Sequence, residues 1–430
     1  MEKKQSQKKT LFQEYSRANE ASLFRKAVKK LGAFKPSGRK FKNDERIQLI
    51  DFFSGAGGTS LGFQALNGLC PTIEFLGACD IDLWSSESYS TNFETPLGCC
   101  DILEISKSPE NIHSFFNKLG YNPERKLILI GCAPCQGFSS HRKKDWDKPD
   151  DKRDSLAFAF TKIVHEIKPD AILMENVPEF LSKRYWSYFQ TVKNSLEQDG
   201  YVIKEQIYDA ASFGVPQERF RSILIGMRKN FCLPNTFVSQ KNYSTVRDAI
   251  GDLEPLAAGE ASKTDYMHKS VFHKKSTLDV IRQVPHNGGS RPKGVGPKCL
   301  DKTKGFSDVY GRLYWDRPSI TITHYVRNPA SGRYVHPEQD RGLTAREAAR
   351  LQSFPDGFHF EGNGDDIYRQ IGEAVPPKMA TGIALSVVTE LLSNEPSEED
   401  LSKSPKTICE PVSSSFSSVI VGLKKRVNKK

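Results

Sequence analysis

One short stretch, residues 126–140, most constrains what the chain can fold into. Its sequence is KLILIGCAPCQGFSS. The apolar run at 127–130 is typical of a strand buried inside a parallel sheet, and a turn-rich loop carrying Cys135 follows it at once. Open α/β sheets place ligands and chemistry in the loops at the carboxyl ends of their strands. The stretch alone leaves two interpretations of Cys135 open, a nucleophile on a rigid loop or a buried, inert thiol.

Strand and helix signals alternate on both sides of this stretch. The other predicted strands are 47–53, 73–79, 98–102, 171–174, 201–208 and 222–227. Helical patterns are predicted between them at 59–66, 109–119, 155–167 and 181–199. This alternation predicts an α/β fold with a mainly parallel sheet and one late antiparallel pair.

The first predicted strand runs into a glycine-rich turn, 54–58, and then into a helix. This order is typical of a nucleotide-cofactor site, because glycines let the backbone approach a ligand and the helix start offers free amides. Asp80 ends the second predicted strand, where a carboxylate suits ribose hydroxyls. A helix N-cap is the other role for such an aspartate, and the two roles can coexist. A further carboxylate, Asp101, ends the third strand.

Charge and cysteine content narrow the class of protein. The 430 residues carry a formal net charge of +10, which favours a polyanionic partner. Nine cysteines lie mostly in apolar runs, so we expect reduced thiols and an intracellular, cytoplasmic protein rather than a disulfide framework. The charged start MEKKQSQKKT predicts no secretory signal, and no apolar run approaches the ~20 residues of a membrane span.

Composition divides the chain into five predicted parts. Residues 1–45 form a basic N-terminal arm with a short amphipathic helix, either a packing arm or a contact to nucleic-acid backbone. Residues 46–228 form the sheet domain, and 229–367 form a smaller, irregular domain rich in Gly, Pro, Lys and His. The stretch 228–340 has 18 Lys and Arg against 11 Asp and Glu, so we expect a polyanion-facing surface there. A helix at 368–392 returns to the sheet domain, and 393–430 is predicted to be a disordered tail.

Four motifs stand in a fixed order along the chain. They are the glycine-rich turn after Phe53, PCQ at 134–136, ENV at 175–177 and QERFR at 217–221. Together with RLQSFP at 350–355 and IGEAVPP at 371–377, they resemble the cytosine-C5 DNA methyltransferase family, in particular bacterial type II modification methyltransferases. The resemblance covers about 47–392. It implies a Rossmann-like S-adenosylmethionine-dependent methyltransferase domain with a smaller target-recognition domain.

The resemblance implies a covalent mechanism. Cys135 matches the family nucleophile, which adds to cytosine C6 so that C5 can attack the sulfonium methyl group of S-adenosyl-L-methionine. Glu175 matches the carboxyl group that protonates N3, and Arg219 and Arg221 match residues that favour the thiolate and contact the flipped base. No metal is expected.

The resemblance also implies the cofactor and DNA contacts. The expected cofactor-binding residues are Phe53, Ser54, Gly55, Ala56, Gly57, Gly58, Asp80, Ile81, Asp101, Ile102, Pro134, Leu156, Glu373, Ala374 and Val375. Glu373 departs from the family pattern, which often has Asn after this glycine. The expected contacts to double-stranded DNA are Gln136, Ser139, Arg142 and Arg291, and further candidates for base contact are Arg282, Arg312, Arg317, Arg327 and Arg333.

Several alternatives accompany this prediction. Cys132 and Cys135 could form half of a metal site or a redox pair, and the glycine-rich turn could belong to a nicotinamide dehydrogenase. The same chemistry could act on tRNA, although the long basic segment favours DNA. The resemblance implies a monomer on DNA that is associated with the bacterial nucleoid when bound to DNA. It also implies a cognate restriction endonuclease as a genetic, not necessarily physical, partner.

Overall fold

The computed structural model describes residues 15–36, 45–95, 98–133, 154–302 and 308–413. Within these ranges the centre of the molecule is a seven-stranded sheet of order β3-β2-β1-β4-β5-β7-β6. Strands β1 to β5 pair in parallel, and β7 runs antiparallel between β5 and β6. The strands are β1 (Ile47–Phe52), β2 (Ile73–Asp80), β3 (Gly98–Cys99), β4 (Leu127–Gly131), β5 (Ala171–Asn176), β6 (Val202–Asp209) and β7 (Phe220–Met227).

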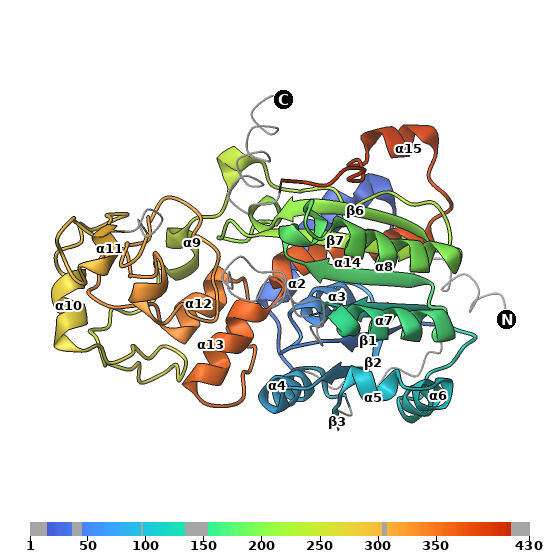
Figure 1. Ribbon diagram of the computed structural model, residues 1–430, viewed down its shortest axis with the longest axis horizontal. Coiled ribbons are helices and arrows are strands. Elements are labelled where there is room, and N and C mark those ends of the chain that lie inside the picture. The colour runs from blue at the N-terminus through green and yellow to red at the C-terminus, as the bar shows by residue number, and fades with distance from the viewer. Residues whose placement is uncertain (1–14, 37–44, 96–97, 134–153, 303–307, 414–430) are drawn as a thin grey trace.

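Helices cover both faces of this sheet, as Figure 1 shows. The helices of one face, α2, α3 and α14, pack on one another, and α7 and α8 pack together on the other face. Residues that alternate along the strands feed two separate hydrophobic cores, one on each face. The helices of this half are α2 (Glu20–Gly32), α3 (Gly58–Asn67), α4 (Leu83–Phe93), α5 (Ile102–Ile105), α6 (Pro109–Lys118), α7 (Asp154–Ile167), α8 (Trp186–Gln198) and α14 (Pro377–Leu392).

The sheet confirms the predicted α/β class and the late antiparallel pair. β1 and β4 are buried along their whole length, as apolar runs with helices on both faces should be. The third strand is only two residues long, shorter than predicted. Glu175 and Asn176 are the last two residues of β5, so the ENV motif begins inside the sheet.

The second half, at the left of Figure 1, has short helices joined by long loops. A small core of its own includes Ile281, Val284 and Val335. Its helices are α9 (Val246–Ile250), α10 (Lys275–Ile281), α11 (Cys299–Lys302), α12 (Ala345–Leu351) and α13 (Gly364–Glu373). Short 3-10 turns complete the described elements: η1 (Arg17–Asn19), η2 (Pro178–Leu181), η3 (Ala210–Phe213), η4 (Gln240–Asn242) and η5 (Pro329–Ser331).

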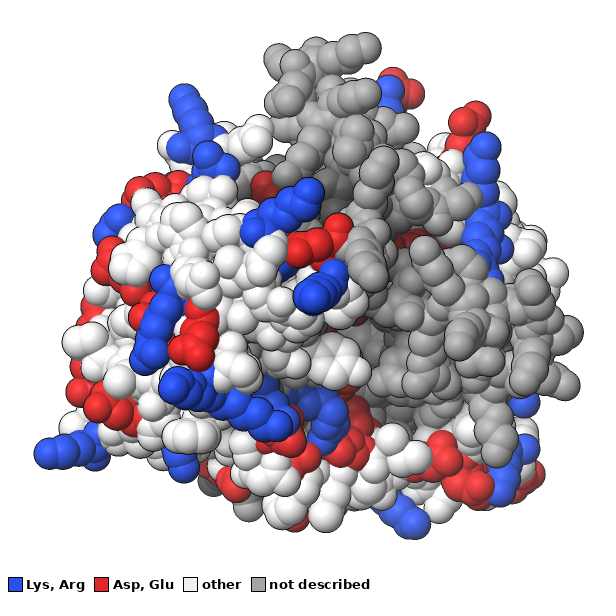
Figure 2. All heavy atoms as spheres, turned by 60° about the vertical axis from the view of Figure 1, so that its left-hand side comes forward, with Lys and Arg blue, Asp and Glu red and all other residues white. Residues whose placement is uncertain are grey.

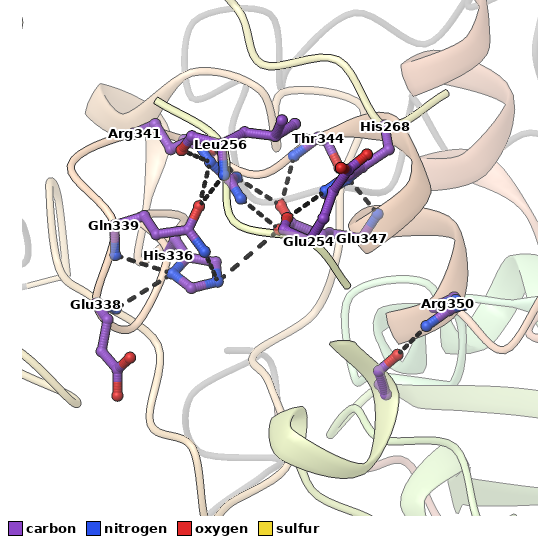
Figure 3. Close-up of polar contacts among 12 residues, drawn as sticks. Glu254, Leu256, His268, His336, Glu338, Gln339, Arg341, Thr344, Glu347 and Arg350 are labelled. Atoms are coloured by element: carbon purple, nitrogen blue, oxygen red, sulfur yellow. Dashed lines mark hydrogen bonds and ion pairs between the residues drawn. The ribbon is translucent and has the colours of Figure 1, made fainter. Parts of the chain in front are cut away.

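A buried ion pair organises the start of α12 (Figure 3). Arg341 makes a two-pronged contact with Glu347 at 2.7 and 2.8 Å, and the two side chains are 0% and 1% exposed. The Thr344 hydroxyl and the Glu347 carboxylate cap the helix reciprocally, as the sequence TARE suggests. Burial lowers the pKa of His336 to about 4, although Glu347 opposes the shift, so this imidazole is neutral at pH 7.

The predicted domain limits near 229 and 367 do not coincide with breaks in packing. Phe237 stacks on Phe24 of α2 at a centroid distance of 4.0 Å, and Phe231 lies in the same core. Residues just after β7 therefore still belong to the sheet half. At the other limit, α13 runs without interruption across residue 367.

Both ends of the described chain pack on the sheet half. Helix α2, predicted from its amphipathic pattern, contacts α14, and Arg17 makes a two-pronged ion pair with the buried Glu390. The prediction of a disordered tail is wrong for 394–413. Helix α15 (Glu398–Lys403) forms there, and the Ile408 amide then donates to Glu205 on the edge strand β6. Edge-strand backbone groups need partners, and nothing in the tail's polar composition reveals that it provides them.

Among the described residues, the longest apolar helices fall short of the length and hydropathy needed to cross a membrane.

Candidate active site

The glycine-rich turn connects the end of β1 to the start of α3. Gly55 and Gly57 adopt positive φ angles of 51° and 97°, and Phe53 also lies in this region at 57°. A side chain at Gly57 would overlap the rings of Phe93 and Tyr89, whereas the position of a Cβ on Gly55 has no atom within 4 Å. The turn is therefore closed on its protein side and open beside Gly55, as a ligand cradle requires.

Carboxylates and an exposed apolar residue border this open side. Asp80 ends β2, and its Oδ2 accepts a hydrogen bond from the Gly55 amide at 2.8 Å. Burial raises the pKa of Asp80, while the amides of Asp82 and Gly55 partly offset the rise. Ile81 is 72% exposed, which is unusual for a branched apolar side chain. At the end of β2 the helix N-cap is Asp82, which accepts from the Ser85 amide at 2.8 Å, and not Asp80. Asp101 caps α5 by accepting from the Leu103 amide.

The segment after α13 closes the turn from the other side. A Cβ on Gly58 would overlap the carbonyl oxygen of Val375, so the two segments are in close contact although more than 300 residues separate them. Desolvation by the surrounding protein raises the pKa of Glu373, and Asp80 and Asp82 add to the rise while Arg369 opposes it. These four charged groups therefore lie near one another at one edge of the site.

The other predicted cofactor residues lie around the same strand ends. Ser54, Ala56 and Ile102 are buried, Ala374 is half-buried in the turn after α13, and Phe53 and Leu156 pack against the core that α7 covers.

A second group of side chains lies at the ends of β5 and β7. Arg221 Nε and Glu175 Oε1 are 2.8 Å apart, and each side chain is 11% exposed. The antiparallel pairing of β5 with β7 brings these two strand ends together. Asn176 holds the turn that follows, because its Oδ1 accepts from the Val177 amide at 2.9 Å. The pair offers a carboxyl group and a guanidinium at one spot, which is suited to binding a polar planar ring.

Arg219 has a different place from the one that the resemblance implies. Its guanidinium donates to the carbonyl oxygens of Ile322, Gly372 and Ala374, at 2.8, 3.2 and 3.1 Å. The side chain is 2% exposed. Residues two apart in a strand point to the same face, but Arg219 and Arg221 point apart because Arg219 lies before β7 begins at Phe220. The structure thus brings Arg221, and not Arg219, to Glu175.

Five predicted site residues, Pro134, Cys135, Gln136, Ser139 and Arg142, lie outside the described residues. The described chain reaches Ala133, two residues after the end of β4, which is the strand next to β5. The Asn176 side chain donates to the Ala133 carbonyl oxygen at 3.4 Å. Burial raises the pKa of Cys132 well above its usual value, and Glu175 and Asp51 add to the rise, so this cysteine remains a thiol at neutral pH.

The arginines of the basic segment are mostly engaged in structure. Arg291 pairs with Asp301 at 2.8 Å and donates to the Val295 carbonyl oxygen. Arg312 and Arg333 are 0% and 8% exposed and bind several backbone carbonyl groups, so base contact is ruled out for Arg312 in this conformation. On the face shown in Figure 2, Lys and Arg side chains are interspersed with Asp and Glu. On that face, the described Lys and Arg side chains therefore do not form an uninterrupted basic patch.

Three buried or bridging residues were missed by the sequence analysis. Gln217 and Gln352 bind one another at 2.6 Å, and Arg369 joins α13 to Asp82 at 2.9 Å. Gln217 and Gln352 both stand inside motifs, QERFR and RLQSFP, and their position in those motifs was the available signal.

Comparisons with known proteins assign the chain to a family. The family model for C-5 cytosine-specific DNA methylases matches residues 47–389. The chain belongs to this family, and it is a DNA cytosine-C5 methyltransferase.

Individual relatives agree with this assignment. The chain is 35% identical to the Type II methylase M.HgiDII of Herpetosiphon aurantiacus, with 79% of this chain and 94% of the relative covered. It is 34% identical to the Type II methyltransferase M1.HphI of Haemophilus parahaemolyticus, with 80% and 87% covered. Among solved structures, an E. coli prophage protein described as a DNA modification methyltransferase matches with a TM-score of 0.56 at 25% identity, covering 81% of this chain and all of that one. DNMT2 of Spodoptera frugiperda shares the fold, with a TM-score of 0.52 at 17% identity over 78% of this chain and 97% of that one.

Proposed function

We propose that this methyltransferase transfers a methyl group from S-adenosyl-L-methionine to C5 of a flipped cytosine in a specific duplex DNA sequence, through a covalent Cys135 adduct. The observation that carries the proposal is the Glu175–Arg221 pair at the ends of β5 and β7. The strand next to β5, β4, leads directly toward Cys135. Glu175 and the end of β4 therefore lie at the carboxyl edge of the same sheet, where open α/β sheets place their reactions.

The proposed roles follow from the electronic demands of cytosine. The Cys135 thiolate forms a bond to C6, and the electrons of the C5–C6 double bond shift to a C4–C5 double bond while negative charge develops at N3. Glu175 supplies a proton at N3, which neutralises the charge that thiolate addition creates. Arg221 holds the Glu175 carboxyl group in place and donates to the O2 atom of the base. C5 then attacks the sulfonium methyl group, whose bond to sulfur breaks to release S-adenosylhomocysteine, and N3 returns its proton to Glu175. Loss of the C5 proton to a base re-forms the C5–C6 double bond, expels the Cys135 thiolate and restores the aromatic ring.

The residues around the glycine-rich turn fit S-adenosyl-L-methionine, which supplies the methyl group. Its ribose hydroxyls, adenine amine and methionine ammonium are donors, and Asp80, Asp101 and Glu373 supply acceptors. The exposed Ile81 offers an apolar surface to a ring, and the open side of Gly55 leaves room for close approach. Glu373 in place of an amide keeps a hydrogen-bond acceptor for the ammonium group.

The proposed physiological role is DNA modification that protects against a paired restriction endonuclease. The Type II names of several relatives support this role. We further propose that the protein acts as a monomer on duplex DNA, with Gln136, Ser139, Arg142 and Arg291 as contacts. Since Arg291 already pairs with Asp301, a DNA contact by Arg291 would have to exchange or share that partner.

A substrate comparison tests the proposal. Purified protein is given labelled S-adenosyl-L-methionine with duplex DNA in one arm and with tRNA in the other. We expect label in DNA and not in tRNA, and labelling of tRNA alone would overturn the choice of substrate. Bisulfite sequencing of a plasmid co-expressed with the protein would then identify the methylated sequence, with the Cys135→Ser variant as the control that leaves the plasmid unmodified.

A further inference from the structure

Three almost fully buried polar side chains meet between the sheet half and the second half. Gln217, Arg219 and Gln352 are 0%, 2% and 0% exposed, and we call them the polar junction. Gln217 and Gln352 bind one another at 2.6 Å, and Gln217 also donates to the Leu351 carbonyl oxygen. All three side chains bind backbone groups of one or both of two segments, 319–323 and 371–374. Burying such groups is costly unless each is satisfied, so the geometry of the junction is strongly constrained.

The first segment, 319–323, belongs to the second half, and both backbone polar groups of Ile322 are bound by the junction. The Ile322 amide donates to Gln217 Oε1 at 2.8 Å, and its carbonyl oxygen accepts from Arg219 at 2.8 Å. Backbone bonds from the Ser319 amide to Pro216 and from the Glu218 amide to Ser319 extend the contact, each at 2.9 Å. The chain then continues to Tyr325, whose ring is 61% exposed. The position of this exposed aromatic therefore depends on the junction.

The second segment, 371–374, is the turn that carries Glu373. Arg219 binds the carbonyl oxygens of Gly372 and Ala374, the residues on either side of Glu373. Gln352 binds those of Ile371 and Ala374 at 2.9 and 3.0 Å. The two segments also touch directly, since a Cβ on Gly372 would overlap the backbone of His324. A shift of either segment would thus break bonds of the other.

Resting on the proposed function, we propose that the polar junction couples cofactor binding to DNA binding, with Arg219 as a positioning residue rather than a contact to the base. Its planar fork spans both segments, and a lysine could not reproduce that arrangement. Occupation of the site around Glu373 fixes 371–374, and the junction then fixes 319–323 and the loop that carries Tyr325. Such coupling typically changes affinity by roughly 5- to 150-fold, and it must be reciprocal between the two ligands.

The coupling is measured as a ratio of binding constants in the whole protein. Affinity for methylatable duplex DNA is determined with and without S-adenosylhomocysteine, the demethylated form of the proposed methyl donor. In the wild type we expect S-adenosylhomocysteine to tighten DNA binding by a factor in the range just given. In Arg219→Lys we expect that ratio to fall to about 1, while covalent trapping on 5-fluorocytosine DNA persists at saturating ligand concentrations.

A matched control separates coupling from loss of stability. Arg333 is also buried and also binds carbonyl oxygens, those of Gly288, Gly289 and Arg312, but it does not touch 371–374. Arg333→Lys should lower stability and leave the ratio at the wild-type value. Gln352→Met removes the contacts to Ile371 and Ala374 without a charge change, and it should lower the ratio even where Arg219→Lys fails to fold.

Two results would overturn the inference while leaving the proposed function intact. One is an active wild type in which S-adenosylhomocysteine does not alter DNA affinity. The other is a folded Arg219→Lys or Gln352→Met that keeps the full wild-type ratio. A wild type that methylates no DNA would instead contradict the proposed function itself.

Discussion

Replacement of Glu175 by Gln tests the role of the carboxyl group at the end of β5. The change keeps the size of the side chain and removes the acid that we assign to N3. Arg221 Nε lies 2.8 Å from the Glu175 carboxyl oxygen. A glutamine amide oxygen can still accept from it, so the contact between the two side chains is weakened but not lost. Hydrogen bonds to charged groups contribute about 1.5–3 kcal/mol, and we expect a stability loss at or below the lower end of that range.

The expected effect on the reaction is larger than the effect on folding. Loss of a general acid typically reduces the rate by about 10²-fold or more, equivalent to roughly 2.7 kcal/mol in the activation barrier. Single-turnover methylation at saturating DNA and S-adenosyl-L-methionine measures this step directly. Cofactor affinity, measured by titration calorimetry, should stay within about threefold of the wild type, since no cofactor residue is altered.

The matched control is Glu179→Gln. Glu179 is 7% exposed in the turn after β5. Burial raises the pKa of its carboxyl group, and a hydrogen bond from its own backbone amide and the charge of Arg221 only partly oppose this rise. This variant removes a nearby acid without touching the place assigned to the base, and it should methylate at close to the wild-type rate. A folded Glu175→Gln with an unchanged single-turnover rate, or an equal loss in both variants, would refute the assignment.

Three further predictions concern the parts that support the site. Burial raises the pKa of Glu20 to about 7 against 4.5 for the free group, so the folded state binds the proton more tightly and the free energy of unfolding falls as pH rises from about 4.5 to 7. Glu20→Gln should remove this fall, a difference on the order of 3 kcal/mol in denaturant unfolding at pH 8, and equal pH profiles would contradict the assignment. Ile408→Ala should lower the free energy of unfolding by about 2 kcal/mol, because the side chain is 9% exposed in the core beside β6. An unchanged melting temperature would show that the tail does not pack there in solution. Arg341→Lys keeps the charge but loses the two-pronged contact with Glu347. Amide hydrogen exchange should therefore accelerate in α12, while the amides of β1 and β4 stay protected. Uniform acceleration, or none, would argue against a local role of Arg341.

The sheet and the Glu175–Arg221 pair were accessible from sequence because their signals are local. β1, β4 and β5 are short apolar runs, and the motifs that follow them predict Phe53 and Glu175 at one edge of a parallel sheet, where the structure has them. The place of Cys135 at the same edge stays a prediction. Arg221 follows from the same logic, since antiparallel pairing brings its strand end beside Glu175. Such positions depend on strand order and on little else.

The rest depends on contacts between distant parts of the chain. Arg219 and Arg221 look equivalent in QERFR. In the structure, however, Arg219 donates to the carbonyl oxygens of residues 322, 372 and 374. Arg312 and Arg333 look like ordinary basic residues until carbonyl groups of neighbouring loops surround them. The polar tail looks disordered because its partner, the edge of β6, lies about 200 residues earlier. No local pattern encodes which backbone group a long side chain will find.

The most direct test of the central claim is covalent trapping. Wild-type protein is incubated with S-adenosyl-L-methionine and duplex DNA in which 5-fluorocytosine replaces the target cytosine, so that the proton normally lost from C5 is absent. The account predicts a denaturation-resistant protein–DNA adduct that maps by mass spectrometry to Cys135 and is absent from Cys135→Ser. Methylation of ordinary DNA without any such adduct, or an adduct at another residue, would contradict the covalent mechanism proposed here.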